Sequence, residues 1–409
     1  MTLYGLIAEF VFSAARPLLD RKYSEGNDER YGYFKRELPK GALWVHAVSV
    51  GEVQSAYPFV RALKAGAPSL EVLLSTITQT GHAMAGQLMG DLVERIYYPW
   101  DAPSILKRAL DALQPKAYVT METEIWPEML LQLERRKIPA FLVNGRLSES
   151  SFERYARFRK FWGRVIRRYS LLMVKSEVEK DRFVELGALP ERVRVTGDCK
   201  VDALIARRQA ADLSDLGPLF HGDRPAILAG STHEGEEKVV FEAFAKLREK
   251  YPSLRLVVAP RHPERAPEVA VLADESGLDG VALMSEAGPD WNVLVIDRIG
   301  VLFSLYGCVK AAFLGGSLVP RGGQNIMEPA IWGIPFCQGP DFRDFLEATQ
   351  ALSEVGVGQI VHDASEMVHF FDDVLSSNVA SECYDKCRRF FATHGGASER
   401  SWKLIQDLL

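Results

Sequence analysis

Carboxylate side chains follow two apolar segments of the chain, at positions where they could take part in acid–base chemistry. Glu52 comes just after the apolar segment 42–48, at the start of an amphipathic helical pattern, and Glu122 comes directly after the segment 117–121. A carboxylate at such a strand end can act as a general base. A glutamate in the first turn of a helix is also common because it complements the helix dipole. Glu52 is the first candidate catalytic residue, and Glu122 could position a sugar hydroxyl or hold Glu52 in place.

Two further junctions in the first half of the chain carry polar side chains. Thr78 lies between the apolar segment 71–76 and a helix predicted from residue 80, where hydroxyl groups suit an anion or a sugar, although plain N-capping is the more common role of such residues. Arg146 follows the segment 139–143 and could pair with a carboxylate or a phosphate. Thr78 and Arg146 are therefore candidate ligand-binding residues.

Small and basic residues follow two apolar segments in the second half. Ser231 and His233 come after the segment 226–230 and open a helix, where backbone N–H groups can hold a phosphate. His233 could donate to that phosphate, although a lone histidine is more often structural. Arg261 follows the segment 254–259 in a turn that could bind a phosphate or a sugar carboxylate, or could be an ordinary solvated turn.

The stretch 315–329 is the richest in residues suited to ligand binding. Paired glycines, including Gly316, follow an apolar segment and would allow the backbone to approach a ligand closely. Asn325 is placed to cap a helix, and Glu328 lies one turn in, where a carboxylate can accept two hydrogen bonds from a ribose diol. The chain has neither the GxGxxG fingerprint nor a P-loop, which argues against an NAD enzyme or an ATPase.

Alternating strands and helices must position these side chains. The first series of predicted strands covers residues 42–48, 71–76, 94–98, 117–121, 139–143, 171–175 and 193–196, and the second covers 226–230, 254–259, 293–296, 311–315 and 334–337. Amphipathic segments between the strands, among them one long helix predicted for 151–168, indicate βαβ units and parallel sheets. Since ligands bind at the carboxyl ends of parallel strands, we expect an α/β protein with two Rossmann-like domains facing a central cleft.

The domain limits follow from these two series of strands. The predicted parts are an N-terminal segment at 1–36, a first Rossmann-like domain at 37–205, a linker at 206–222, a second Rossmann-like domain at 223–395 and a closing helix at 396–409. A chain of 409 residues is long enough for two or three domains with large buried cores.

Composition and cysteine spacing exclude several classes of protein. The formal net charge of −5 gives no overall attraction to nucleic acid. The five cysteines are scattered without a CxxC pair or a Cys/His metal spacing, so we expect free thiols in a reducing compartment and no metal site.

The first 19 residues form a strongly apolar segment that is interrupted by Glu9 and Arg16. The segment is too short and too charged for a confident spanning helix, and it lacks the cleavage site of a signal peptide. One interpretation is an amphipathic or weakly inserted membrane anchor, which the basic residues that follow would support. The other is a helix that packs on the protein body.

Seven motifs, each at a predicted strand end, together make the sequence resemble a known family. They are LWVHAVSVGE at 43–52, METEIWP at 121–127, NGRLS at 144–148, TGDCKVD at 196–202, STHEGEE at 231–237, PRHPER at 260–265 and GGSLVPRGGQNIMEPA at 315–330. In this order they resemble the 3-deoxy-D-manno-octulosonic acid (Kdo) transferases of Gram-negative lipopolysaccharide synthesis, which are GT-B glycosyltransferases. The resemblance covers nearly the whole chain.

The resemblance implies a membrane-associated, inverting enzyme that needs no metal or cofactor and moves Kdo from CMP-Kdo to a lipid A precursor such as lipid IVA. It implies that Glu52 is the general base, that Glu122 is also required, and that the enzyme works at the cytoplasmic face of the inner membrane. Thr78 and Arg146 are expected to bind the acceptor. The expected CMP-Kdo-binding residues are Ser231, His233, Arg261, Gly316, Asn325 and Glu328.

One departure from the family pattern concerns Gln324, which stands where the family commonly has histidine. Glutamine can form hydrogen bonds but carries no imidazolium charge, so nucleotide affinity or its pH dependence is expected to differ. A basic set could meet the phosphates of the acceptor or an anionic membrane surface, or could be a solvated helix face. This set consists of Arg154, Arg157, Arg159, Lys160, Arg164, Arg167 and Arg168.

Two other interpretations of the sequence stay open. Another GT-B sugar-nucleotide enzyme with a different acceptor, such as an epimerase, would share the two domains and Glu328 but would not need the pair Glu52 and Glu122. A non-catalytic, membrane-associated protein that only holds a sugar nucleotide would have no use for Glu52. The motifs do not indicate how many Kdo residues are added.

Overall fold

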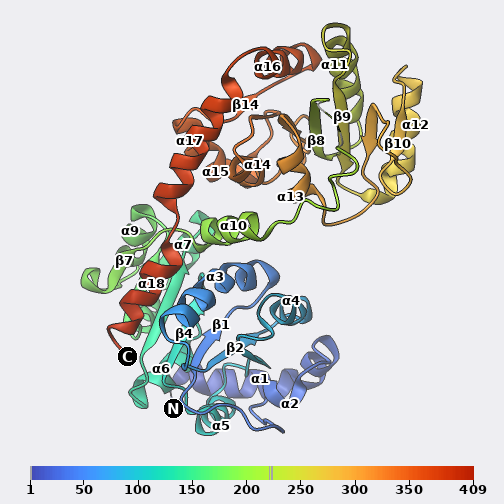
Figure 1. Cartoon of the computed structure of the whole chain (residues 1–409). Coiled ribbons are helices and arrows are strands. Elements are labelled where there is room, and N and C mark those ends of the chain that lie inside the picture. The colour runs from blue at the N-terminus through green and yellow to red at the C-terminus, as the bar shows by residue number, and fades with distance from the viewer. Residues whose placement is uncertain (1, 221, 223) are drawn as a thin grey trace. The chain divides into compact units, whose positions relative to one another are not determined.

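The computed structural model describes residues 2–220, 222 and 224–409, which form two compact units (Figure 1). Unit 1 comprises the chain up to Ala203 together with His394–Leu409, and unit 2 comprises Leu204–Thr393. The domain limits predicted at residues 1 and 223 fall outside the described residues. Residue 205, predicted to end the first domain, lies inside a helix that continues to Ala210.

Unit 1 is built on a seven-stranded parallel sheet in the order β3–β2–β1–β4–β5–β6–β7. Strands β1, β2, β4, β5 and β6 are buried along their whole length, as expected where helices cover both faces of a sheet. The strands are β1 (Leu43–His46), β2 (Val72–Thr76), β3 (Glu94–Tyr97), β4 (Ala117–Met121), β5 (Ala140–Gly145), β6 (Leu171–Val174) and β7 (Val193–Val195).

Helices cover both faces of this sheet, and alternate residues of β1 enter the two cores. Leu43 and Val45 pack with residues of α3 and α18, whereas Trp44 packs with residues of α5 and α6. The helices are α1 (Leu3–Lys22), α2 (Asn27–Arg30), α3 (Val50–Gly66), α4 (Gln79–Met89), α5 (Pro103–Leu113), α6 (Pro127–Arg135), α7 (Glu149–Ala156), α8 (Arg159–Ile166), α9 (Glu177–Glu185) and α18 (Ala397–Gln406). Helix α10 (Cys199–Ala210) begins in unit 1, and its residues from Leu204 onward belong to unit 2.

Unit 2 is built on a second seven-stranded parallel sheet, in the order β10–β11–β9–β8–β12–β13–β14. Its strands are β8 (Ala226–Thr232), β9 (Arg255–Pro260), β10 (Val281–Leu283), β11 (Val293–Val295), β12 (Ala311–Leu314), β13 (Phe336–Gln338) and β14 (Gln359–Ile360). Its helices are α11 (Glu236–Lys250), α12 (Ala266–Glu275), α13 (Leu302–Leu305), α14 (Met327–Trp332), α15 (Leu346–Glu354), α16 (Ala364–Ser376) and α17 (Val379–His394). The predicted arrangement of two Rossmann-like sheets is therefore confirmed.

The single helix predicted for residues 151–168 is wrong, because the structure has two helices there. Helix α7 ends at Ala156 and α8 begins at Arg159, with Phe158 in a non-helical conformation between them. No proline or glycine marks this break in the sequence, so periodicity alone could not locate it.

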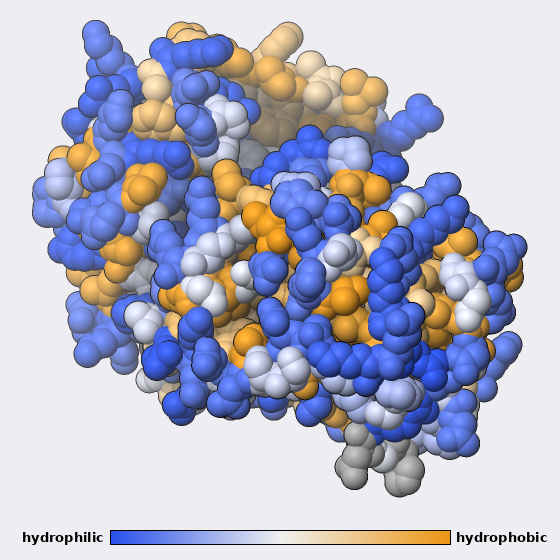
Figure 2. All heavy atoms as spheres, turned by 90° about the horizontal axis from the view of Figure 1, so that it is seen from above, coloured by the Kyte–Doolittle hydropathy of each residue, from blue (hydrophilic) through white to orange (hydrophobic). Residues whose placement is uncertain are grey.

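Helix α1 carries much of the exposed apolar surface of unit 1. Leu3, Phe10 and Leu18 are 75%, 74% and 73% exposed. Among the described residues, no helix has both the length and the apolar character needed to cross a membrane. The face of the molecule in Figure 2 is mostly hydrophilic, with hydrophobic side chains lying between the hydrophilic ones.

Candidate functional site

Glu52 lies in the first turn of α3, directly beyond the carboxyl end of β1. Its Oε2 accepts the Val48 N–H at 2.8 Å, and its Oε1 accepts the Ser49 hydroxyl at 3.2 Å. Burial is the main cause that raises the pKa of Glu52 to about 8. The Val48 hydrogen bond opposes this rise, and the nearby carboxylates of Glu124 and Glu122 add to it. Glu52 is thus a carboxyl group fixed in place with a pKa close to neutral.

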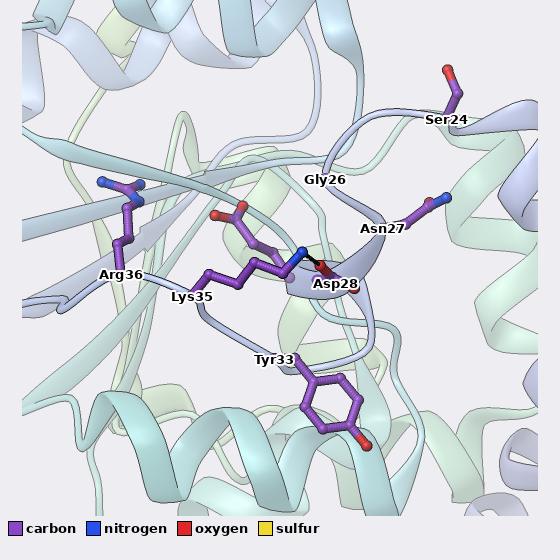
Figure 3. A pocket seen from close by; sticks show the side chains of 8 residues that line it. Ser24, Gly26, Asn27, Asp28, Tyr33, Lys35 and Arg36 are labelled. Atoms are coloured by element: carbon purple, nitrogen blue, oxygen red, sulfur yellow. Dashed lines mark ion pairs between the residues drawn. The ribbon is translucent and has the colours of Figure 1, made fainter.

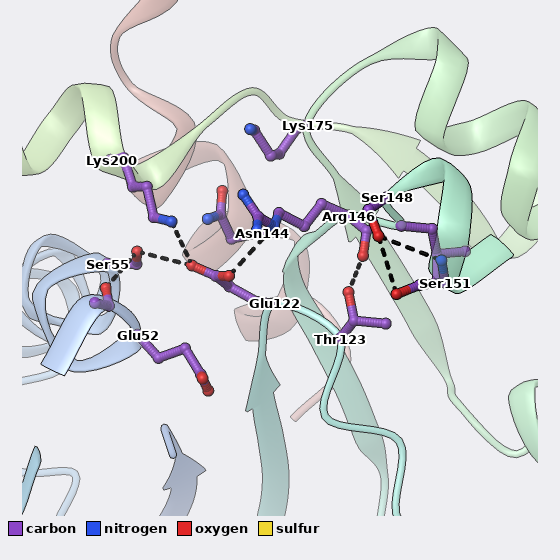
Figure 4. A network of polar contacts seen from close by, with 12 residues as sticks. Glu52, Ser55, Glu122, Thr123, Asn144, Arg146, Ser148, Ser151, Lys175 and Lys200 are labelled. Carbon is purple, nitrogen blue, oxygen red and sulfur yellow. Dashed lines mark hydrogen bonds and ion pairs between the residues drawn. The ribbon is translucent and has the colours of Figure 1, made fainter. Parts of the chain in front are cut away.

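Glu122 is the centre of a polar network that joins three elements (Figure 4). Its Oε1 lies 2.9 Å from Nζ of Lys200 on α10 and accepts the hydroxyl of Ser55 on α3 at 3.4 Å. Its Oε2 lies 3.5 Å from Nε of Arg146, beyond β5. The backbone of Glu122 has φ +56°, a left-handed conformation that is unfavourable for a residue with a side chain and recurs at functional sites. Glu122 therefore brings two cations to this edge of the sheet.

The predicted interaction of Glu122 with Glu52 takes an indirect form. Among the described residues, no hydrogen bond joins the two carboxyl groups. Glu122 instead contacts Ser55, which bonds to the Gly51 carbonyl in the same first turn of α3 as Glu52. Glu122 thus contacts, through Ser55, the same first turn of α3 that carries Glu52.

Asn144 and Thr78 hold the loops around these carboxylates. Asn144 is buried with φ +59°, and its Oδ1 accepts the Cys199 N–H at 2.9 Å, which fixes the start of α10 next to Lys200. Thr78 caps α4 and donates its hydroxyl to the Val48 carbonyl at 3.2 Å. Thr78 and Arg146, both predicted to bind the acceptor, therefore lie at the same sheet edge as Glu52.

Lys200 had no predicted role, although it belongs to the motif TGDCKVD. Its partner Glu122 follows β4, far from Lys200 in the sequence, so residue spacing does not report their contact. Membership of the motif is the one feature of the sequence that points to Lys200.

In unit 2, the glycine-rich loop after β12 wraps around the side chain of Glu236. The carboxylate Oε2 accepts N–H groups from Gly316 at 2.7 Å and His233 at 2.9 Å. Oε1 accepts N–H groups from Ser317 at 3.0 Å and Leu318 at 2.9 Å. At the helix start that was predicted to hold a phosphate, the His233 N–H is therefore bonded to a carboxylate of the protein, as are three N–H groups of the glycine-rich loop.

Basic side chains surround this loop. Arg261 follows β9 and Arg321 lies within the loop; both are exposed, and neither has a carboxylate partner among the described residues. The pKa of His233 is lowered mainly by burial. The charges of Arg321, His262 and Arg261 lower it further, and Glu236 opposes them. This edge of unit 2 is therefore electropositive beside a neutral imidazole.

The remaining predicted donor-site residues lie around the same sheet edge. Ser231 is the residue before the end of β8 and has a left-handed conformation with φ +57°. Asn325 accepts the Met327 N–H at 3.2 Å, but the N-cap of α14 is Ile326 and Glu328 lies in the first turn, so the prediction that Asn325 caps this helix with Glu328 one turn in is wrong. Glu328 in α14 pairs with Arg207 at 2.9 Å, and burial raises its pKa while Arg207 lowers it.

A separate hollow of about 450 Å³ in unit 1 lies beside the loop between α1 and β1 (Figure 3). Two of its charged groups are already paired: Lys35 Nζ lies 2.5 Å from Asp28 Oδ2, and Arg36 binds Glu94 outside the loop. None of the predicted site residues lines this hollow.

The sequence is similar to those of known transferases. The family described as 3-Deoxy-D-manno-octulosonic-acid transferase (kdotransferase) matches residues 25–203. The 3-deoxy-D-manno-octulosonic acid transferase of Haemophilus influenzae is 34% identical over 88% of this chain and 86% of its own. That of Bordetella pertussis is 30% identical over 90% and 87%.

Among solved structures, the chain resembles UDP-GlcNAc 2-epimerase from Neisseria meningitidis bound to UDP-GlcNAc. The TM-score is 0.59 at 16% identity, with 90% of this chain and 98% of that one covered. A glycosyltransferase of kitacinnamycin gives a TM-score of 0.54 at 14% identity, covering 91% and 100%. These likenesses concern the fold, whereas the sequence relatives show that the chain belongs to the Kdo transferase family of GT-B glycosyltransferases.

Proposed function

We propose that this enzyme transfers Kdo from CMP-Kdo to a lipid A precursor such as lipid IVA, with inversion at the anomeric carbon, in lipopolysaccharide synthesis. The observation that carries the proposal is Glu52, a carboxyl group fixed at the end of β1 with a pKa near 8. The acceptor hydroxyl must lose its proton as it attacks the anomeric carbon. A base whose pKa lies near the working pH suits that step.

Glu122 supports this chemistry by orienting cations. Lys200 and Arg146 both pair with its carboxylate. The proposed sugar carries a carboxylate and the proposed acceptor carries phosphates, so fixed cations beside the base would orient both. Glu122 is thus assigned to the organisation of the site, and Glu52 to proton removal.

The donor half of the reaction is assigned to unit 2. The leaving CMP carries a phosphate, and Arg261 and Arg321 offer it cations without carboxylate partners in the described part of the chain. Glu328 is suited to the ribose hydroxyls, with Arg207 holding its carboxylate in position. No cofactor is needed for this displacement.

A membrane surface is the proposed working place, at the cytoplasmic face of the inner membrane. Leu3, Ile7 and Phe10 recur along α1 at helical spacing and are exposed. The helix is fixed to the protein body by Tyr4, whose hydroxyl donates to Asp101 at 2.8 Å, and by Glu9, which accepts the Ser104 N–H at 3.0 Å. These contacts favour a helix that lies on the membrane rather than one that crosses it.

The test is a transfer assay with the purified full chain, CMP-Kdo generated in situ and lipid IVA, resolved by mass spectrometry. A product heavier by one or more Kdo units is expected and would count the additions. The Glu52→Gln enzyme serves as the inactive comparison. If CMP-Kdo stays intact with folded wild-type protein, and UDP-GlcNAc is epimerised instead, the proposed reaction is wrong and the epimerase alternative holds.

A further inference from the structure

We infer that Glu236 is a positioning residue whose carboxylate occupies the backbone anion site of the glycine-rich loop, so that this loop presents the cationic side chain of Arg321, and not its N–H groups, to the donor phosphate. The inference rests on the proposed function, because it concerns how unit 2 binds CMP-Kdo. In this inference, the Glu236 carboxylate takes the place that a bound phosphate would take at the backbone N–H groups of a glycine-rich loop.

The geometry saturates both partners. Glu236 is fully buried, and its two oxygens accept four N–H groups at 2.7 to 3.0 Å, from His233, Gly316, Ser317 and Leu318. An ionised carboxylate has about four acceptor sites. Successive backbone N–H groups that converge in this way form a nest for an anion. Here the nest is filled from within the chain, so a phosphate finds no free N–H at these four positions.

The glycines of the loop serve this internal contact. A side chain at Gly315 would lie 2.5 Å from the Ser231 carbonyl and 2.8 Å from the Glu236 carboxylate. Gly316 has φ +65°, which glycine adopts without strain. The close approach predicted between this backbone and a ligand is therefore an approach of the loop to Glu236 and to the end of β8.

The contact between Glu236 and the loop also positions the two side chains, Arg321 and His233, that remain available to the donor. A Cβ at Gly316 would lie 3.3 Å from the His233 ring and 3.5 Å from Cβ of Arg321, so these side chains border the segment that Glu236 holds. Gly323 also donates its N–H to the Gly316 carbonyl at 2.8 Å, which ties the far end of the loop to it. Glu236 thus acts on the donor through Arg321 and His233, without touching it.

The first experiment compares wild-type enzyme with Glu236→Gln. The amide keeps the size of the side chain but turns a donor toward the loop N–H groups, which leaves buried donors unpaired. We expect KM for CMP-Kdo and Kd for CMP, measured by calorimetry, to rise about tenfold or more, with KM for lipid IVA unchanged. The control is Glu242→Gln, on the exposed side of the same helix α11, where Lys246 is the one partner that the carboxylate has among the described residues.

A rescue experiment separates positioning from a general loss of structure. In Glu236→Ala, added formate is expected to fill the empty nest and restore CMP affinity, whereas chloride at equal ionic strength is not. If Glu236→Ala loses CMP affinity and formate does not restore it, the role of Glu236 is merely structural. The same conclusion follows if Glu236→Gln and Glu236→Ala both unfold while Glu236→Asp behaves as wild type. Unchanged CMP affinity in folded Glu236→Gln would also overturn the inference. If wild-type enzyme binds CMP but transfers no Kdo, the proposed reaction fails, and the CMP affinities still decide the role of Glu236.

Discussion

At the scale of single residues, Glu52 combines a position at the carboxyl end of β1 with an environment that disfavours its charge. Its pKa in the folded protein is about 8, against an ordinary value of 4.5. The folded state therefore holds a proton that the unfolded chain releases. Between pH 4.5 and about 8, a rise in pH removes stability from the folded state, because the unfolded chain gains free energy by releasing this proton while the buried carboxyl group still holds it. The charge that Glu52 needs for its proposed role as base is thus a cost to the fold.

This conflict predicts opposite effects of Glu52→Gln on activity and stability. We expect kcat/KM of the wild-type enzyme to rise with pH up to about 8, and the variant to lose activity by about 10²- to 10⁴-fold. At pH 9 the variant should gain on the order of 1 kcal/mol in unfolding free energy, with little gain at pH 5. A pH–rate profile and urea unfolding at both pH values test this.

The control for Glu52 is another glutamate in a first helical turn. Glu177 opens α9, is 70% exposed and pairs with Lys180 at 2.8 Å. Glu177→Gln should change neither activity nor the pH dependence of stability. Retained turnover in Glu52→Gln, or a flat wild-type profile between pH 6 and 9, would remove Glu52 from the role of base.

The candidate site residues differ in how far sequence could predict them. Glu52 and Glu122 follow neighbouring strands β1 and β4, so the rule that ligands bind at carboxyl ends places both at one sheet edge. The contacts of Asn144 and Glu236 join residues 55 and 80 positions apart. Such pairings depend on how strands are ordered and loops bend, which composition and periodicity do not report.

At the scale of elements, the strands predicted from apolar segments match the structure except at the edge of the second sheet. Strands β10 and β14 were not predicted. β14 has only two residues, both exposed, and β10 is only partly buried, so neither gives an apolar run in the sequence. The linker predicted from residue 206 begins instead after α10, which continues to Ala210. The residues from 206 to 210 are mostly polar, and a polar composition is found in exposed helices as well as in linkers.

Helix α18 makes the end of the chain part of unit 1. Trp402 is 5% exposed and packs against Gly66 at the end of α3. Asp202 accepts the N–H groups of Gly396 and Ser398 at 2.6 and 2.7 Å, which fixes the start of the helix. The C-terminal helix therefore supports the same helix α3 whose first turn carries Glu52.

Removal of the Trp402 ring should destabilise unit 1 without changing the chemistry. Trp402→Ala is expected to lower the stability of unit 1 by about 3 kcal/mol through the cavity it leaves. The turnover of the folded enzyme should stay near wild type, because Gly66 lies about 21 Å along α3 from Glu52. Hydrogen exchange of unit 1 amides measures the first effect and kcat the second.

The comparison for Trp402→Ala is Lys403→Ala, an exposed neighbour on α18 that should leave exchange unchanged. A lower kcat in folded Trp402→Ala would mean that α18 controls the position of Glu52 as well as the stability of the unit.

At the scale of the whole molecule, the net charge of −5 opposes binding to an anionic membrane. The proposed attraction to a membrane must then come from a local surface that combines apolar and basic side chains. Phe161 of α8 lies against Tyr4 of α1, with ring centroids 6.0 Å apart, so the exposed basic residues Lys160 and Arg164 of α8 belong to the neighbourhood of α1. The sequence left open whether the apolar N-terminal segment packs on the body or meets a membrane. The structure shows that α1 contacts the body and still exposes one apolar side.

This arrangement predicts that the exposed side of α1 carries the membrane affinity. The double variant Leu3→Asp/Phe10→Asp should lose binding to vesicles containing anionic lipid by at least about tenfold, since burial of each apolar side chain contributes about 1.5–3 kcal/mol. Salt should weaken the binding of wild-type protein only in part, because the apolar contribution is not screened. The matched control is Ile299→Asp, an 88% exposed apolar residue of unit 2, which should bind as wild type. Sedimentation with vesicles of graded charge measures these affinities. Equal losses in the two variants would assign the affinity to general hydrophobicity, and wild-type binding by the α1 variant would make α1 a helix that only packs on the protein body.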